Sequence, residues 1–288
     1  MTAVLKTENL THSYSNGMMG AVAAIQNINL EIEKGELVGI IGHTGSGKST
    51  LLQHFNGLLK PDSGKIYLNG KDIWQSKESI RSARFKVGLC FQYPEYQLFE
   101  ETVYKDIAFG PKNMGLSDDD IDRRVKKAIE FVGLKSEYLE KSPFDLSGGE
   151  KRRVAIAGVM AMEPEILILD EPTAGLDPHG REIVLSMVKQ YKEKTGSTVI
   201  LVSHSMEDIA KIADRVLVLN KSKVAMFGTV KEVYSQSEKL CDMGLNVPQI
   251  TKIFTKLRSM GYDVSNSVFT VEQGVNEILR YLEGRKSE

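Results

Sequence analysis

Hydrophobic residues along the chain follow two different periods, which separate predicted strands from predicted helices. Apolar and polar residues alternate at 28–33 and at 65–69, a pattern typical of half-exposed antiparallel strands. Nearly unbroken apolar runs at 36–41, 166–169 and 198–202 are typical of strands buried in a parallel sheet. We therefore expect an α/β protein with a parallel core sheet and a small antiparallel β-subdomain beside it.

The pattern changes to a helical period between these core strands. Ser117 and Asp120 have the spacing of a capping box, and apolar residues recur at helical spacing from Ile121 to Val132. A second helical pattern runs from Gly149 to Met160. Roughly residues 95–160 are therefore predicted to form a helical insertion in the core.

A glycine-rich stretch follows the apolar run at 36–41 and matches the G-x-x-x-x-G-K-[ST] phosphate-binding loop at every position. Its glycines allow a tight turn that points backbone N–H groups and the start of the next helix at phosphate oxygens. Lys48 is expected to reach the β- and γ-phosphates, and Ser49 to hold Mg²⁺. A chance glycine-rich turn is the less favoured alternative. The predicted nucleotide-binding residues are Gly42, His43, Thr44, Gly45, Ser46, Gly47, Lys48, Ser49 and Thr50.

Candidate catalytic side chains follow two other predicted core strands. Asp170 suits the Mg²⁺ shell of a nucleotide, and Glu171 suits the activation of an attacking water. His204 follows the strand at 198–202 and can bond a γ-phosphate oxygen or the water. Ligands bind at this edge of open α/β sheets. Without the phosphate loop, an acidic turn and a structural histidine would be the preferred interpretations.

Other residues carry weaker signals. Ser147, Gly148 and Gly149 open a helix that can bind an anion, although these residue types are common at helix starts. Tyr14 is predicted in the loop after the first strand, where it can stack on a base or pack on its own sheet. The side chain of His43 is interpreted as structural.

Composition limits the classes of function. The chain has 288 residues, 41% hydrophobic and 26% charged, which is ordinary for a globular protein with an ample core. Its net charge of −1 gives no case for nucleic acid, and the basic cluster 151–153 is interpreted as a solvated helix face. Cys90 and Cys241 suggest neither a disulfide nor a zinc site, which fits a reducing cytosol. Residues 1–6 lack a signal-peptide core, and no apolar run approaches the about 20 residues that span a bilayer.

The order of these motifs resembles the ATP-binding cassette (ABC) ATPase family over about residues 4–235. That family implies a P-loop NTPase core with an antiparallel β-subdomain and an inserted helical subdomain. Glu150 departs from the usual signature glutamine, and the D-loop begins Ala-Gly where Ser-Ala is commoner, but neither change removes a catalytic group. The motifs are the phosphate loop, Tyr14 for adenine stacking, Gln92 of the Q-loop, the signature Leu146–Glu150, Ile166–Asp170 with Glu171 as Walker B, the D-loop Ala174–Asp177 and the switch residue His204.

The resemblance also implies how the site works. ATP and Mg²⁺ are the implied ligands, and two cassettes sandwich two nucleotides, so that Ser147 and Gly149 of one chain face the γ-phosphate held by another. Hydrolysis then opens the dimer and drives an attached machine. The implied catalytic residues are Gln92, Glu171 and His204, and the implied Mg²⁺ ligands are Ser49, Gln92 and Asp170.

A narrower resemblance lies in 91–99 and 102–111, together with the phosphate loop and 56–61. These stretches look like the ATPase subunit of energy-coupling factor (ECF) transporters, the cobalt and vitamin importers. That family implies a second ATPase, identical or different, a transmembrane subunit docked on Tyr93–Phe99, a substrate-binding membrane protein, and a place at the cytoplasmic face of the cell membrane. Alternatively, some of these aromatic residues are core of the helical insertion.

The residues after the cassette form a small C-terminal extension, so the expected domains are 1–235 and 236–288. Two apolar helical faces with a short strand between them, at 264–271, are predicted there. The extension is too small to fold confidently alone and should pack on the cassette or on a second subunit, and the resemblance favours dimerisation. The two faces comprise Ile250, Ile253, Phe254, Leu257 and Met260, and then Val275, Ile278, Leu279 and Leu282.

Two other functions fit the ATPase motifs. One is a soluble ABC ATPase that acts on nucleic acid or ribosomes, against which stand the single cassette, the near-neutral charge and the lack of a long coiled-coil insertion. The other is a non-hydrolysing regulatory subunit, which Glu171 and His204 make less favourable. The cargo, a metal ion or a vitamin, does not contact the cassette and so leaves no trace in this sequence.

Overall fold

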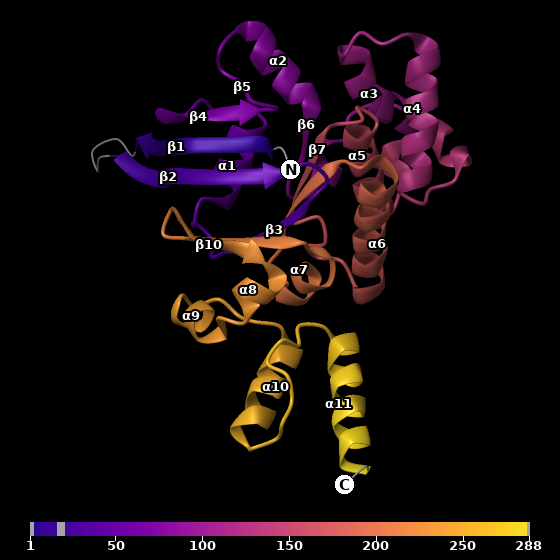
Figure 1. The fold of residues 1–288 in the computed structure, drawn as a ribbon. Coiled ribbons are helices and arrows are strands. Elements are labelled where there is room, and N and C mark those ends of the chain that lie inside the picture. Colours follow the sequence, from indigo (N-terminus) through magenta and orange to yellow (C-terminus); the bar gives the residue numbers. More distant parts are fainter. Residues whose placement is uncertain (1–2, 16–20, 287–288) are drawn as a thin grey trace.

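A six-stranded sheet in the order β10-β9-β3-β8-β7-β6 forms the core (Figure 1). Five neighbouring strands, β9, β3, β8, β7 and β6, are parallel, and β10 pairs antiparallel with β9. The computed structural model describes residues 3–15 and 21–286; Met1 and Thr2, part of the stretch considered for a signal peptide, lie outside the described residues. The strands are β3 (Leu37–Gly42), β6 (Val87–Cys90), β7 (Ile166–Asp170), β8 (Thr198–Val202), β9 (Arg215–Asn220) and β10 (Lys223–Thr229).

The predicted antiparallel β-subdomain is confirmed as a second sheet in the order β2-β1-β4-β5. Its strands are β1 (Ala3–Ser15), β2 (Ala21–Glu33), β4 (Ser63–Leu68) and β5 (Lys71–Asp72). The prediction that Tyr14 lies in a loop after the first strand is wrong. Irregular register lets β1 and β2 continue pairing for longer than the alternation indicates, and Tyr14 pairs with Val22.

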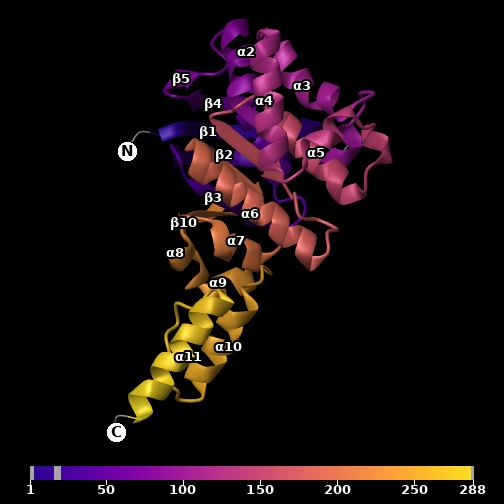
Figure 2. The same cartoon turned by 90° about the vertical axis from the view of Figure 1, so that its right-hand side faces the viewer.

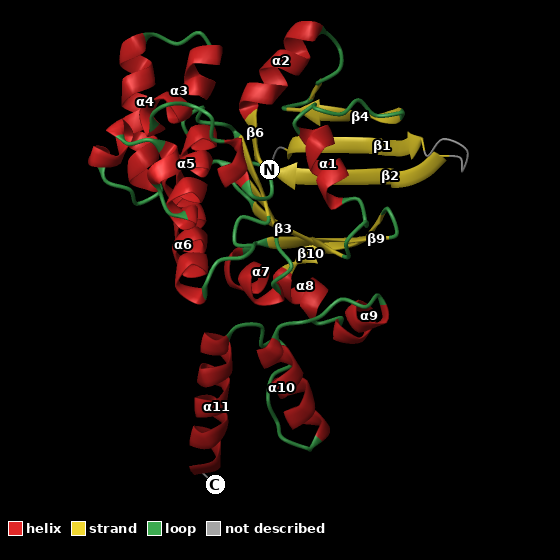
Figure 3. Ribbon diagram, turned by 180° about the vertical axis from the view of Figure 1, so that it is seen from behind, coloured by secondary structure: helices red, strands yellow, loops and turns green. Residues whose placement is uncertain are grey.

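Hydrophobic clusters cover both faces of the core sheet. Because side chains alternate along a strand, Leu167 and Leu169 face the cluster formed with the helical insertion and α6 (Pro178–Thr195), whereas Ile166 and Ile168 face the β-subdomain. The second cluster also contains one side of α1 (Lys48–Phe55). The helix that follows the phosphate loop is thus held between the two sheets (Figure 3).

The helical insertion between β6 and β7 is confirmed. It contains α3 (Val103–Asn113), α4 (Asp118–Phe131) and α5 (Gly148–Met160), which lie together beside the sheet (Figure 2). Only half of the predicted capping box at Ser117 forms. Its hydroxyl accepts the Asp120 N–H, but the Asp120 carboxylate bonds this hydroxyl rather than the Ser117 N–H, because aspartate is one methylene shorter than glutamate.

Helices after β8 divide into those that join the main core and those that extend from it. The main cluster, which is the one that contains Leu167 and Leu169, also includes Ile209, Tyr234 and Leu240. These side chains come from α7 (Met206–Ile212), α8 (Val230–Tyr234) and α9 (Ser237–Asp242). α10 (Gln249–Ser259) and α11 (Val271–Lys286) project away from the sheets (Figure 1) and have a small cluster of their own. A further helix, α2 (Lys77–Lys86), precedes β6.

The predicted strand at 264–271 is wrong, because this segment is a loop that enters α11. Val264 and Val268 are buried against Phe254 instead of alternating across a sheet. Side chains satisfy the backbone in place of a partner strand: Thr251 donates to the Val268 carbonyl, and Glu277 accepts the Ser265 N–H.

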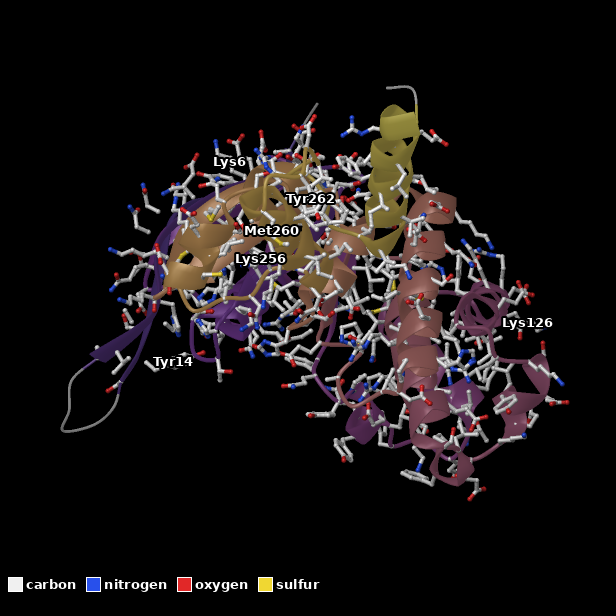
Figure 4. The ribbon with its side chains drawn as sticks, turned by 90° about the horizontal axis from the view of Figure 1, so that it is seen from below. Lys6, Tyr14, Lys126, Lys256, Met260 and Tyr262 are labelled. Atoms are coloured by element: carbon white, nitrogen blue, oxygen red, sulfur yellow. The ribbon has the colours of Figure 1, made fainter. Side chains whose placement is uncertain are left out.

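Both predicted C-terminal apolar faces form helices, but neither is fully covered. Phe254 is buried, whereas Ile253 and Met260 are exposed, and Figure 4 shows Met260 near Tyr262 at this end of the molecule. The stripe on α11 is 42–52% exposed and comprises Val275, Ile278, Leu279 and Leu282. The described residues therefore leave this stripe uncovered, whereas Leu240, Leu245 and Phe269 of the same extension do pack in the cassette core. No described helix is both long and apolar enough to cross a membrane.

Replacing one leucine in the main cluster and one on the exposed stripe of α11 should show how differently the two regions contribute to stability. We expect Leu240→Ala to lower the free energy of unfolding by about 2–5 kcal/mol, because Leu240 is fully buried in the main cluster. The matched control Leu279→Ala, which is half exposed on α11, should change it by about 0.5 kcal/mol or less in the isolated chain. Urea denaturation measures both values, and equal losses would contradict this packing.

Candidate functional site

A cavity of about 550 Å³ opens between the phosphate loop and the β-subdomain, a volume in the usual range for small-molecule sites. It brings together residues from β1, the phosphate loop and the ends of three core strands. Gly42, His43 and Ser46 belong to the loop but not to its lining. The predicted residues that line it are Tyr14, Thr44, Gly45, Gly47, Lys48, Ser49, Thr50, Gln92, Glu171 and His204.

The phosphate loop is a strand–loop–helix turn, as predicted. Gly47 has φ +101°, and a Cβ atom there would lie 2.2 Å from the Ala24 carbonyl oxygen, so the position requires glycine. Helix α1 begins at the next residue and leaves its first N–H groups directed at the cavity. This end of α1 is therefore suited to binding an anion.

Lys48 is the buried cation of the loop. Its Nζ donates to the Gly42 carbonyl at 2.7 Å and to the His43 carbonyl at 2.9 Å. Burial lowers the pKa of Lys48, while the carboxylates of Glu171 and Asp170 act in the opposite direction. The ammonium thus lies between the loop carbonyls and the acidic strand ends, where a phosphate can replace a carbonyl as its partner.

Ser49 and Asp170 meet at the start of α1. The Ser49 hydroxyl donates to an Asp170 carboxylate oxygen at 2.9 Å, and burial raises the pKa of Asp170. Hydroxyl and carboxylate oxygens fit Mg²⁺, which commonly binds one or two protein ligands and completes its shell with phosphates and water. The described residues contain no group of three or more His, Cys, Asp and Glu side chains arranged to hold a metal by themselves.

The three predicted catalytic residues converge on one carboxylate. Glu171 accepts the Gln92 side-chain N–H at 3.0 Å, and its other oxygen lies 2.7 Å from His204 Nε2. A left-handed backbone at Glu171 (φ +52°), with its N–H bonded to the Val202 carbonyl, turns this side chain away from Asp170 and toward the cavity. The two adjacent acids therefore face different partners.

Tyr14 stands at the other end of the cavity. Its ring is half exposed, its hydroxyl lies 3.4 Å from Thr50 Oγ1, and the rings of Tyr14 and His12 pack in a T-shaped arrangement. An exposed aromatic face beside the phosphate loop is suited to stacking on a base.

The signature residues lie outside this cavity. Ser147 caps α5 in a complete capping box, in which Glu150 accepts both the Ser147 N–H and its hydroxyl. Bonds from Ser147 and then from the Tyr138 hydroxyl lower the pKa of Glu150 to about 2. A Cβ atom at Gly148 or Gly149 would meet nothing within 4 Å. Sequence reasoning missed this capping box, although its S-x-x-E pattern is visible.

The interpretation of 151–153 as a solvated face is wrong for Arg152, which is only 4% exposed. Its guanidinium forms an ion pair with Glu95 at 2.6 Å and donates to the carbonyls of Pro172 and Ala174. Burial favours a raised pKa for Glu95, but Arg152 holds it below its ordinary value. Arg152 thus joins the signature helix, the segment after Gln92 and the D-loop.

A family model for ABC transporters matches residues 25–174. The chain is also 55% identical to the energy-coupling factor transporter ATP-binding protein EcfA2 of Caldanaerobacter subterraneus subsp. tengcongensis, over 98% of this chain and 99% of that protein. The chain belongs to the ABC transporter family. Within it, this is an ATP-binding protein of an energy-coupling factor transporter, and its ATP hydrolysis is coupled to transport.

Solved structures of the family support the fold. The structure of cbiO1 from Clostridium perfringens, part of the ABC transporter complex cbiONQ, has a TM-score of 0.75 and 39% identity, covering 91% of this chain and 98% of that chain. The ATP-binding cassette MJ0796, dimeric and bound to ADP and Pi after hydrolysis, has a TM-score of 0.71 and 28% identity, covering 78% and 98%. The predicted P-loop NTPase fold of an ABC ATPase is confirmed.

A double-mutant cycle should reveal the buried ion pair. We expect Arg152→Met to lower the free energy of unfolding by about 3–5 kcal/mol, because it leaves the Glu95 carboxylate without its partner. Combining it with Glu95→Gln should cost less than the sum of the two single changes. The control Lys151→Met should cost about 1 kcal/mol or less. Strict additivity in urea denaturation would contradict the pairing.

Proposed function

We propose that this chain hydrolyses MgATP in the cavity between the phosphate loop and β1. Lys48 and the loop N–H groups bind the phosphates, and Tyr14 stacks on adenine. Ser49, Asp170 and Gln92 would hold Mg²⁺, which would neutralise charge on the phosphates. The observation that carries the proposal is the position of the Glu171 carboxylate, held by Gln92 and His204 at the edge of the same cavity.

Each group then has a distinct task. Glu171 orients the attacking water and accepts its proton, and His204 bonds the water or a γ-phosphate oxygen. Gln92 donates to Glu171 and would also be available to hold Mg²⁺ when the ion is bound. The remaining loop residues, from Gly42 to Thr50, shape the phosphate-binding backbone.

A second ATPase subunit, identical or different, completes the site. Ser147, Gly148 and Gly149, at the N-terminus of α5, do not line the nucleotide cavity of their own chain. They therefore cannot contact a phosphate bound there, and a Cβ atom at either glycine would meet nothing within 4 Å. In a pair of cassettes these residues face the γ-phosphate held by the other chain. The dimeric state of the MJ0796 cassette supports this arrangement.

The proposed function also divides the chain into two domains. We assign 1–235 to the nucleotide-binding domain, with a helical subdomain at about 95–160, and 236–288 to an accessory dimerisation domain. Its first helix, α9, packs in the cassette core, and α10 and α11 extend from it. Support for the second assignment comes from the exposed apolar stripe on α11, which a partner surface can cover.

A transmembrane subunit docks in a groove of about 350 Å³ beside the Q-loop. Phe99 and Phe109 are exposed there and stack edge to face, and Tyr93 and Tyr96 are exposed as well, so these four aromatic residues are not core. Such a partner, together with a substrate-binding membrane protein, places the chain at the cytoplasmic face of the membrane, where it powers uptake of a vitamin or a transition-metal ion. The transporter functions of EcfA2 and cbiO1 favour these partners.

Removal of the Glu171 carboxylate should separate nucleotide binding from hydrolysis. We expect Glu171→Gln to bind ATP normally but to lower kcat by about 10²-fold or more, because the amide cannot accept the proton of water. Lys48→Ala, the control, should instead lose nucleotide affinity. Equilibrium binding and phosphate release measure the two effects. Wild-type turnover in Glu171→Gln would overturn the assignment.

A charge in the groove should block docking without affecting the ATP site. We expect Phe99→Glu and Phe109→Glu to lose copurification with the membrane subunit from detergent-solubilised host membranes, because a carboxylate would be buried at the contact. The control Phe144→Glu, exposed but outside the groove, should copurify. Recovery of all three only with ribosomes or nucleic acid would exclude the transport function.

A further inference from the structure

One side chain of the phosphate loop contacts the C-terminal region. His43 Nε2 lies 2.7 Å from the backbone carbonyl oxygen of Met243, 200 residues away. A carbonyl only accepts hydrogen bonds, so Nε2 must carry a hydrogen and donate it. The sequence interpretation of His43 as a structural side chain gave no reason to expect this contact.

The partner carbonyl belongs to the end of a helix. Met243 is the C-cap of α9, where the last carbonyls have no partner within the helix, and His43 supplies a donor. Gly244 follows with φ +73°, and a Cβ atom there would lie 2.9 Å from His43 Nε2. The left-handed glycine therefore both ends the helix and leaves room for the imidazole.

The acceptor is fixed to the cassette and continuous with the C-terminal helices. Leu240 and Leu245, on either side of Met243, are buried in the main core. A few residues later, the N–H of Gln249 at the start of α10 donates to Glu207 of α7 at 3.0 Å. Helix α7 begins two residues after His204. The connector, residues 243–249, thus contacts both the phosphate loop and the helix that follows the switch histidine.

We propose that His43 is a positioning residue that couples the nucleotide state of the phosphate loop to the C-terminal unit, residues 243–286. Its carbonyl accepts from Lys48, the cation that turns to the phosphates, while its imidazole holds Met243. A shift of the loop backbone on nucleotide binding therefore moves the connector, and with it the base of α10. The inference rests on the proposed nucleotide site.

Hydrogen exchange on the full chain tests this coupling. A saturating non-hydrolysable ATP analogue should change exchange at the amides of Gly244 and Leu245, which bond the carbonyls of Cys241 and Leu240 in the wild type. His43→Leu should lose this change even at saturation, and His43→Gln, which retains an N–H donor, should keep part of it. Equal behaviour of the two variants would overturn the role of the hydrogen bond.

A double-mutant cycle between Gly244 and His43 provides a second test. Gly244→Ala should weaken affinity for the analogue in the wild type by about fivefold or more, and less in a His43→Ala background, because the smaller side chain removes the clash. Gly70→Ala is the matched control: its φ is +75°, and a Cβ atom there would meet nothing within 4 Å. Its effect should be independent of residue 43, and additivity of Gly244→Ala with His43→Ala would overturn the proposal.

The two proposals fail in different ways. Absence of nucleotide binding or hydrolysis in the wild type removes the proposed function itself. Normal binding and hydrolysis, with exchange at Gly244 and Leu245 unaffected by nucleotide, removes only the coupling through His43.

Discussion

The parallel register of β3, β8, β7 and β6 is the constraint on which the rest of the structure depends. Ile40 of β3 and Asp170 of β7 both pair with Val202 of β8, and Cys90 of β6 pairs with Leu169. Parallel strands deliver their carboxyl ends to one edge, so the phosphate loop, Gln92, Glu171 and His204 meet there although they are far apart in sequence. A slip of one residue would exchange the two faces of a strand and bury the wrong side chains.

This dependence explains how much the sequence could predict. The core strands are continuous apolar runs, and each motif follows its strand within two residues. The local sequence pattern therefore predicts both the fold and the residues that surround Glu171. The phosphate loop needs only its own strand and helix. Those features are set by neighbours in the chain, and they are the ones that a single sequence can reveal.

Features that depend on distant partners could not be predicted in this way. Arg152 looks like one of three adjacent basic residues, and only the fold shows that Glu95 and the carbonyls of Pro172 and Ala174 surround it. The contact of His43 with Met243 joins residues 200 positions apart in the chain. A short strand is predicted at 264–271, but no neighbouring strand is present among the described residues to pair with it, and Thr251 and Glu277 satisfy the backbone instead. At 264–271, tertiary packing thus overrides the local preference for a strand.

Two features remain incomplete in a single chain, and they differ physically. The signature has the N–H groups of Gly148 and Gly149 at the start of α5, away from the nucleotide cavity of its own chain, whereas α11 exposes an apolar stripe. Under the proposed function one partner cassette satisfies both, but the contact through phosphate disappears on hydrolysis. Burial of apolar area does not depend on the nucleotide. The stripe can therefore keep two chains together while the ATP sites open, so that each round of hydrolysis becomes a motion within a lasting pair rather than a new encounter.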